Sequence, residues 1–574
     1  MERIASDEMQ TLKDVIIQFL SASEIHRFEE SLHGISERAP SGGEDGNMLR
    51  PISEGSKIKL ANIFKMTAIA SHRAGEESRN KLNKALRGLA EKFVASELVD
   101  FLHTLLIYAE DNFKTPEIPK SRKDMSQEID QELGKIICYL RILNTLMKVV
   151  MNRLSCEESE MNLNAVKECI ASILLAAHRS TKVPRSSEFK DVCVLQKENL
   201  QYYSQLVENY LSFVGEVLHF GLEDREGGVG KVMRYVLKKS ALHVVPLGLL
   251  SLGSNQDWTR KNSRKQAETT LKTICKLSNS RNLEALLVGA DYSSKCDEIS
   301  SSLLLFPQGL LGAVLRATRS GFDNEGWKQD PTLKHVLLCG TMNVKYPNLK
   351  AHIAIIVSML LEMVEDYLCE NQILGIGCLQ HLIENVNPSD LNLYNHAAVI
   401  YDTLFKQLYG TKNATLQVLL PCLLKILKVL EPFGERINVD VTSKWDQVTR
   451  KIITNLEYEN KVPIRRSLAR NLKSFVACLG VNSVKHLSSL LRLAKSCLEF
   501  HDGEDEDMRI STLEFLKETV VACWPVILDH VGEIIKVILR LVVDINFKGS
   551  FTSKKAIIQL EQLALEIVLF LKVR

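Results

Sequence analysis

The segment GGVGK at residues 227–231 has the residue types of a phosphate-binding loop. In such a loop, the backbone N–H groups of a Gly-rich turn at the start of a helix surround a phosphate. The spacing argues against that chemistry, because Arg225 occupies the first glycine position and Val232 replaces the Ser or Thr that binds magnesium. We therefore interpret the segment as a plain loop.

Histidine and cysteine are numerous, at 14 and 13 residues, but their spacing matches no known site. The chain has no H-E-x-x-H motif, no C-x-x-C pair and no G-x-S-x-G elbow. His381, His396 and His486 stand singly within helical patterns, where packing and surface roles are the default. The sequence thus offers no catalytic, cofactor-binding or metal-binding residue, and we predict that the protein is not an enzyme.

Two charged segments leave alternatives open. The acidic run HDGEDED at 501–507 has side chains that bind a cation or a basic partner, but a solvated loop between helices is the favoured interpretation. Arg465 and Arg466 open the helical pattern VPIRRSLARNL, and Arg470 and Asn471 follow one turn later. This polar ridge either faces a partner or forms ion pairs between adjacent repeats of the same chain.

Charge and hydropathy narrow the class of protein. The 72 Lys and Arg nearly balance 70 Asp and Glu, and a net charge of +2 gives no support for binding nucleic acid or anionic lipid. Cysteines within apolar helical patterns, such as Cys378 and Cys422, indicate a reducing compartment. The apolar run at 244–252 is broken by Pro246 and Gly248, and the N-terminus lacks a secretory signal. We expect a cytoplasmic and nuclear protein that binds neither nucleic acid nor membrane.

The elements that must position these residues are helices. The chain has 574 residues, only 6% of them aromatic, and apolar residues recur at helical spacing over most of its length. Such a length exceeds the roughly 250 to 300 residues at which a single core stops growing. Clustered Gly, Ser and Pro predict breaks at 31–57, 181–189, 223–230, about 278–302 and 320–331.

The second half of the chain repeats a helical hairpin. Apolar spacing predicts one helix over 352–364 and a second after the turn EDYLCEN, and the second can be aligned with three later segments. The matched leucines, Leu379, Leu423, Leu472 and Leu516, lie 44, 49 and 44 residues apart. HEAT and armadillo units repeat at roughly 40 to 47 residues. We therefore predict an all-α, HEAT/armadillo-like α-solenoid of stacked helical hairpins.

The block from about 335 to 545, roughly two fifths of the chain, resembles a known family. The most specific run, 366–409, carries Asp366, Tyr367, Glu370, Asn371, Gly375, Cys378, His381, Asp390, Tyr394, Tyr401 and Tyr409. Later matches include Arg465, Arg466, Arg470, Asn471, Phe475, Asp502, Gly503, Trp524 and Pro525. These features are similar to those of the second Tel-interacting subunit of the Triple T (TTT) co-chaperone complex.

The resemblance implies a non-enzymatic scaffold that joins two larger α-solenoid subunits. With the heat-shock-protein-90 system, such a subunit supports the folding, stability and assembly of phosphatidylinositol-3-kinase-related kinases, which act in growth control through TOR signalling and in the DNA damage response. We expect partner contacts at two groups of residues. They are Asp366, Tyr367, Glu370 and Asn371 in the first group, and Arg465, Arg466, Arg470 and Asn471 in the second.

The expected organisation has four parts: an N-terminal helix at 1–30, a flexible loop at 31–57, a diverged helical half at 58–330 and the HEAT-like half at 331–574. A HEAT-repeat adaptor for nuclear transport or phosphatase assembly is the alternative function, because these classes also use helical stacks.

Overall fold

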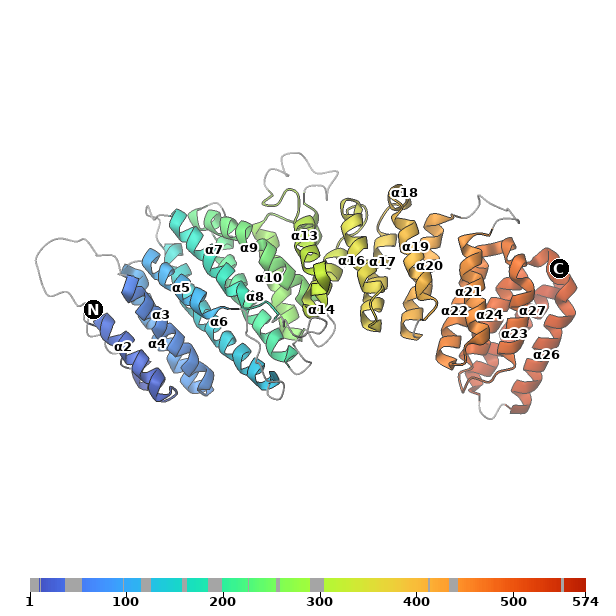
Figure 1. Cartoon of the computed structure of the whole chain (residues 1–574), viewed down its shortest axis with the longest axis horizontal. Helices are drawn as coiled ribbons and strands as arrows, with labels where there is room; N and C mark the ends of the chain where they lie inside the picture. The colour runs from blue at the N-terminus through green and yellow to red at the C-terminus, as the bar shows by residue number, and fades with distance from the viewer. Residues whose placement is uncertain are drawn as a thin grey trace, which may run out of the picture. The chain divides into compact units, whose positions relative to one another are not determined.

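The computed structural model describes residues 10, 12–36, 54–96, 98–114, 125–156, 163–183, 199–223, 225, 227–253, 259–289, 304–410, 413–432, 442–548 and 552–573. Over these residues the chain is helical, with no β-strand (Figure 1). It folds as two compact units, Met1–Val344 and Lys345–Arg574. The division expected at 330/331 lies inside the first unit.

Unit 1 is a stack of helices, most of them long. They are α2 (Ala22–Ser36), α3 (Glu54–Arg73), α4 (Glu76–Ser96), α5 (Leu98–Asn112), α6 (Met125–Cys156), α7 (Leu163–Arg179), α8 (Leu200–Glu223), α9 (Gly228–Gly253), α10 (Lys261–Leu277), α11 (Leu283–Val288), α13 (Leu311–Phe322), η2 (Asp323–Glu325), α14 (Gly326–Gln329) and α15 (Thr332–Met342). Helix α8 packs against α6, α9 and α10, and the odd-numbered helices α3, α5, α7 and α9 pack in succession. This alternation is typical of stacked helical hairpins.

Unit 2 continues the same kind of stacking. Its helices are η3 (Lys350–His352), α16 (Ile353–Val364), α17 (Cys369–Glu384), α18 (Pro388–Leu393), α19 (His396–Gln407), α20 (Asn413–Leu430), α21 (Lys444–Tyr458), α22 (Val462–Leu479), η4 (Gly480–His486), α23 (Leu487–Leu498), α24 (Asp507–Ala522), α25 (Trp524–Ile527), η5 (Leu528–His530), α26 (Val531–Lys548) and α27 (Lys554–Val573). The second helices of the hairpins, α17, α20, α22, α24 and α27, pack one upon the next.

The repeat register predicted from the leucines is confirmed. Leu379, Leu423 and Leu472 are 0% exposed and Leu516 is 2% exposed, and each lies in a second helix of a hairpin. The first predicted helix, over 352–364, is α16 together with the end of η3. The predicted all-α, HEAT-like fold is therefore confirmed. Its physical basis is that apolar residues at 3.6-residue spacing bury one face of each helix against the next.

Several predicted breaks are shorter than expected. Helix α9 begins at Gly228, so most of GGVGK forms the first turn of a helix and not a loop. The stretch 320–331 is mostly helical, and Trp327 stacks on Phe322 with ring centroids 5.5 Å apart. Gly321 serves close packing there, because an added Cβ would lie 2.5 Å from Leu333 Cδ1. The glycine of this stretch therefore permits a close helix contact and does not mark a break.

The other predicted breaks have different outcomes. Residues 31–36 belong to α2 and residues 54–57 to α3, and the centre of the predicted loop at 31–57 lies outside the described residues. Residues 184–189 also lie outside them. Helix α11 occupies part of the stretch 278–302, where Asn282 caps it by accepting a hydrogen bond from Ala285 N at 2.8 Å.

Two helices, Gly228–Gly253 and Asn413–Leu430, are long and apolar enough to cross a membrane by length and composition alone. In their most apolar windows, 61% and 50% of residues are buried. Helix α9 packs against α7, α8, α10 and α15, and α20 packs against α17, α19 and α22. Core helices of a solenoid have these properties because they contact neighbours on several sides.

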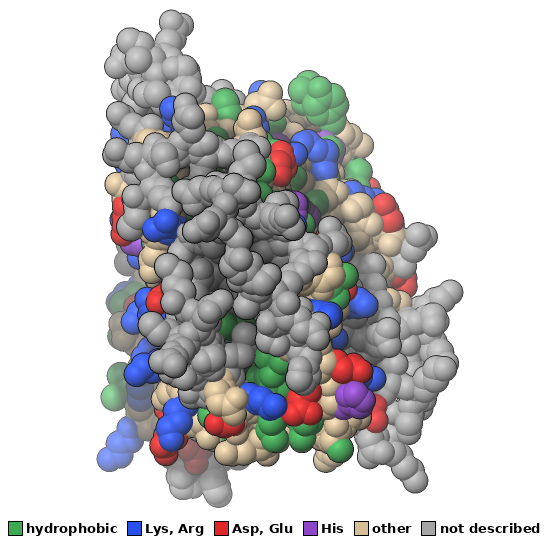
Figure 2. Space-filling view, turned by 90° about the vertical axis from the view of Figure 1, so that its left-hand side faces the viewer, with side chains coloured by type: hydrophobic (Ala, Val, Ile, Leu, Met, Phe, Trp, Pro, Cys, Tyr) green, Lys and Arg blue, Asp and Glu red, His purple; other side chains and the backbone are tan. Residues whose placement is uncertain are grey.

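Acidic and basic side chains are interspersed over the described part of the face in Figure 2, at the N-terminal end of the chain. Two ion pairs of this region join separate segments: Lys13 Nζ lies 3.2 Å from Glu29 Oε1, and Arg73 Nη1 lies 2.7 Å from Glu24 Oε2. The hydrogen bond from Arg73 lowers the pKa of Glu24 to about 2. Mixed charge of this kind is typical of a solvated surface without a strong field of one sign.

Candidate interaction surface

Both groups of predicted partner residues lie at the same end of the hairpins of unit 2. The turns 365–368, 408–410, 459–461 and 499–506 each connect the first helix of a hairpin to its second helix, and they meet at the lower end of the stack in Figure 1. We call the surface formed by these turns and the adjoining helix ends the turn edge. Successive hairpins stack in parallel, so equivalent turns align along one edge.

A ladder of polar contacts begins at the first turn of this edge. Asn371 Nδ2 donates to Asp366 Oδ2 at 2.6 Å, and Gln372 Nε2 donates to the Asp366 carbonyl at 2.7 Å. Thr415 Oγ1 donates to Gln372 Oε1 at 3.3 Å, which joins α17 to α20. Asp366 and Asn371 are buried at 6% and 4% exposure, so this predicted pair supports the turn from within.

The ladder continues through α20, α22 and the turn before α24. Ser467 Oγ donates to Asn413 Oδ1 at 2.7 Å. Arg466 Nε donates to Asp502 Oδ2 at 2.7 Å, and Met508 N donates to the same carboxylate oxygen at 3.0 Å. The Asp502 side chain is fully buried, so the favoured interpretation of 501–507 as a solvated loop is wrong for this residue. Charge-assisted bonds of this kind hold adjacent repeats in one register.

The remaining residues of the polar ridge, Arg465, Arg470 and Asn471, make weaker contacts within the chain. Arg470 Nη2 lies 3.7 Å from Asp507 Oδ2, and Asn471 Nδ2 donates to the Ser467 carbonyl at 2.8 Å. The guanidinium carbon of Arg465 lies 5.2 Å from the centroid of the Phe500 ring. Of the two alternatives for the ridge, pairing between repeats describes Arg466 and Arg470. Arg470 remains 61% exposed, so its ion pair contributes little stability.

A buried ion cluster lies beside this edge. Arg509 is 2% exposed, and its Nη1 donates to Glu506 Oε1 at 3.1 Å while its Nη2 donates to Asp544 Oδ2 at 2.8 Å. Glu506 is 0% exposed, and burial raises the pKa of its carboxyl although Arg509 opposes that shift. Thr552 Oγ1 donates to the same Glu506 oxygen at 3.4 Å. The cluster ties α24 to α26 and to the start of α27.

Large aromatic side chains stand exposed at the turn edge, one in each successive hairpin. Tyr367, Tyr409 and Tyr458 are 68%, 68% and 77% exposed, and Phe500 is 39% exposed. They lie 42, 49 and 42 residues apart, close to the spacing of the matched leucines, and each lies within three residues of the end of a first helix. The turn edge therefore presents a regular row of aromatic side chains, which we call the aromatic row.

The aromatic row has the composition of a protein-binding surface. Single exposed apolar residues are common on any protein, but aromatic residues are enriched at interfaces and in the few positions that carry most binding energy. Lys451 Nζ lies 3.8 Å from the Tyr409 ring centroid and the Arg465 guanidinium lies over Phe500, so two of the rings already make cation–π contacts. Tyr367 and Tyr458, at 68% and 77% exposure, are the two rings of the row over which the described residues place no cation.

Known proteins support the resemblance that the sequence predicted. The chain is 31% identical over 309 residues to human TELO2-interacting protein 2, a match that covers 53% of this chain and 58% of that protein. The mouse protein of the same name is 31% identical over 293 residues, covering 51% of this chain and 55% of that protein. The chain is similar to TELO2-interacting protein 2. It spans a little more than half the length of these relatives. No family model matches the chain.

Solved structures to which the chain is similar include importin beta and a karyopherin. Importin beta in an ammonium sulfate condition is 12% identical with a TM-score of 0.40, covering 97% of this chain and 72% of that chain. The karyopherin Kap121p bound to the SUMO protease Ulp1p is 13% identical with a TM-score of 0.38, covering 100% of this chain and 58% of that chain. These low scores support no statement about function.

The structure thus separates the eight predicted partner residues into three kinds. Tyr367 and Glu370 are exposed and available to a partner, whereas Asp366, Asn371 and Arg466 serve the fold. The other three, Arg465, Arg470 and Asn471, make weaker contacts within the chain. Sequence reasoning missed three important positions, Tyr458, Phe500 and the buried Arg509. The repeat spacing contains a signal for the first two. When 464–480 is aligned with 508–524 without gaps, Arg509 falls opposite Arg465. Among the described residues, no group of three His, Cys, Asp or Glu side chains is placed to hold a metal ion.

Proposed function

We propose that this protein is a non-enzymatic scaffold subunit of the TTT co-chaperone complex. The similarity to TELO2-interacting protein 2, at about 31% identity over half of the chain, is the observation that carries the proposal. The name of these relatives describes an interaction with TELO2, and the proposal extends that partnership to this chain. The helical stack agrees with such a role, because solenoids present extended surfaces to large partners.

The turn edge is the surface that we assign to the larger α-solenoid subunits. The polar ladder fixes neighbouring helices relative to one another, so the backbone positions that carry the aromatic row are set before a partner arrives. A preorganised backbone loses less conformational entropy on binding, which leaves more of the contact energy for affinity. Tyr367 and Tyr458 then act as anchors, and Glu370 supplies a polar contact at the rim.

The clients in this proposal are phosphatidylinositol-3-kinase-related kinases, which the complex stabilises together with the heat-shock-protein-90 machinery. Large kinases expose apolar surface while they assemble, and a scaffold that holds its partner subunits in place shortens that stage. The role requires neither nucleic acid nor membrane, and it places the protein in the cytoplasm and nucleus.

Affinity purification with quantitative mass spectrometry tests the proposal. The parent protein should recover the two larger TTT subunits in near-equal amounts, together with immature kinases. A Tyr367→Ala, Tyr458→Ala double variant should lose most of this recovery while keeping the helical content and melting temperature of the parent. These side chains are exposed, so their removal leaves the core intact.

The matched control is a Tyr346→Ala, Tyr394→Ala double variant. These tyrosines are 60% and 74% exposed, but they lie at the opposite end of the hairpins, near the contact of Tyr346 N with Asn385 Oδ1 at 3.2 Å. The control should recover the partners like the parent. Loss of the partners from both double variants alike would reject the turn edge as the binding surface, and their absence from the parent would reject the TTT role.

A further inference from the structure

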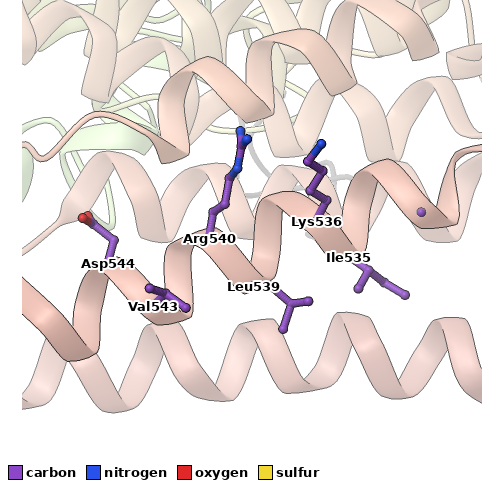
Figure 3. A pocket seen from close by; sticks show the side chains of 7 residues that line it. Ile535, Lys536, Leu539, Arg540, Val543 and Asp544 are labelled. Carbon is purple, nitrogen blue, oxygen red and sulfur yellow. The ribbon is translucent and has the colours of Figure 1, made fainter.

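Helix α26 carries an apolar stripe that no other described element covers. Leu539 and Val543 are 59% and 54% exposed, and with Gly532 and Ile535 they line a shallow hollow of about 620 Å³ (Figure 3). These residues follow one another at three- and four-residue spacing, so they occupy a single face over three turns of the helix. An uncovered stripe of this length marks an interaction site.

Basic side chains run along one side of this stripe. Lys536 and Arg540 point away from Ile535 and Leu539 in Figure 3. They also line a second hollow, between α23 and α26, to which Arg492 and Lys495 contribute. Carboxylates already engage part of this charge, since Arg540 lies 3.2 Å from Glu499 and Arg492 lies 2.9 Å from Glu457.

The surface nevertheless keeps unused positive charge. Within the described part of unit 2, neither Lys495 nor Lys536 has a carboxylate within ion-pair distance. Among the described residues that line the first hollow, the only acidic one is Asp544, to which Arg509 Nη2 donates a hydrogen bond at 2.8 Å. Glu533 also lines the second hollow, but four Lys and Arg side chains surround it, so the stripe combines an apolar centre with a predominantly basic flank.

We propose that this face of α26 binds an acidic amphipathic helix of a partner protein. The apolar side of that helix packs on Ile535, Leu539 and Val543, and its carboxylates approach Lys536, Arg540 and Lys495. Helical grooves accept amphipathic helices through anchors at i, i+3 or i+4, and i+7, which is the spacing of the stripe. The site adjoins the last turn of the turn edge, because Arg540 pairs with Glu499 at 3.2 Å, but its apolar stripe lies on α26, and the proposal stands without the TTT assignment.

Charge distinguishes this occupant from a second copy of the chain. A two-fold contact between two α26 faces would place Lys536 and Arg540 of one copy near the same residues of the other copy. Like charges brought together in this way oppose association, whereas carboxylates on a partner helix favour it.

Site-specific crosslinking tests the proposal on the full chain in cells. A photoreactive p-benzoylphenylalanine replaces Leu539, and a control variant carries it at Leu565 on α27, which is 57% exposed. The crosslinked segment is identified by mass spectrometry, synthesised, and measured against the purified full chain by fluorescence anisotropy. We expect a partner segment from position 539 with apolar residues at helical spacing and at least two carboxylates beside them.

Reversing the charge of Lys536 and Arg540 then tests whether these side chains recognise carboxylates of the peptide. A Lys536→Glu, Arg540→Glu double variant should bind the peptide about tenfold more weakly, and replacing the peptide's carboxylates with lysines should restore binding to that variant. The folded state of the variant is checked by its melting curve, because both side chains are exposed. A crosslink to another copy of the chain, a crosslinked segment that is basic or unpatterned, no crosslink at position 539, or binding unchanged by charge reversal would each overturn the proposal.

Discussion

Replacing Arg509 with methionine is expected to be among the most damaging single changes in unit 2. The guanidinium of Arg509 contacts Glu506 at 3.1 Å and Asp544 at 2.8 Å, and the Glu506 side chain has no solvent exposure. Methionine preserves much of the length of the side chain but removes the cation. Removing one partner of a buried ion pair leaves the other charge without compensation and lowers the free energy of unfolding by about 3 to 5 kcal/mol.

The free energy of unfolding of the Arg509→Met variant should also depend on pH. Burial already raises the pKa of Glu506, and removing Arg509 raises it further. A carboxyl whose pKa is higher in the folded state than in the unfolded state destabilises the fold increasingly as the pH rises through the folded value. The deficit of the variant should therefore be larger at pH 8 than at pH 5.

Amide hydrogen exchange is the suitable assay, because a chain of two units need not unfold in one step. Peptides from α24 should lose protection in the variant, while peptides from α8 in unit 1 serve as an internal reference. An Arg509→Met, Glu506→Gln double variant should recover most of the loss. The exposed pair of Arg492 and Glu457 provides a matched control, since Arg492→Met should cost less than about 1 kcal/mol. Unchanged protection in α24, or equal loss in α8, would refute the role of the cluster.

Three further changes test other parts of the structure. Leu472→Asp should lower the stability of unit 2 by about 4 kcal/mol, because it buries a carboxylate without a partner, whereas Ser474→Asp at an exposed position of the same helix should melt like the parent. Burial lowers the pKa of His178 to about 3, so the stability that neutral His178 contributes is lost as the pH falls from 6.5. Urea unfolding at pH 7 and pH 4.5 should show about 2.5 kcal/mol of this loss, and the same loss in His178→Leu would contradict it. Asp446→Ala removes the capping box at Ser443 together with the contacts of Asp446 with His486 and Lys485, and it should cost about 2 kcal/mol in thermal unfolding. A melting curve like that of the parent would show that these contacts are dispensable.

Much of the fold in the second half was predictable from apolar spacing alone. Helix α16 lies where the spacing predicted it, and the register of Leu379 and Leu472 holds because each helix must bury one face against its neighbour. The structure of the Gly-rich stretches was harder to predict. Gly228 begins a helix and Gly321 allows a close helix contact, and a single sequence cannot separate these uses of glycine from a turn.

The candidate surface was predictable only in part. Sequence reasoning found the two polar groups at the turn edge, but the spacing of Arg466 within a helix does not say which residue it meets. Its partner, Asp502, lies 36 positions away, in a run that composition alone described as solvated. The pairing depends on how neighbouring repeats stack, and that information lies in the packing of α22 against α24.

Reconstitution tests the central proposal most directly. The purified full-length chain is mixed with the two larger TTT subunits, and the mass of the product is measured by light scattering after size-exclusion chromatography. The proposed role predicts one stable complex that contains all three proteins in equal numbers, and that is not formed by the Tyr367→Ala, Tyr458→Ala variant. A chain that elutes by itself at every concentration tested would contradict it.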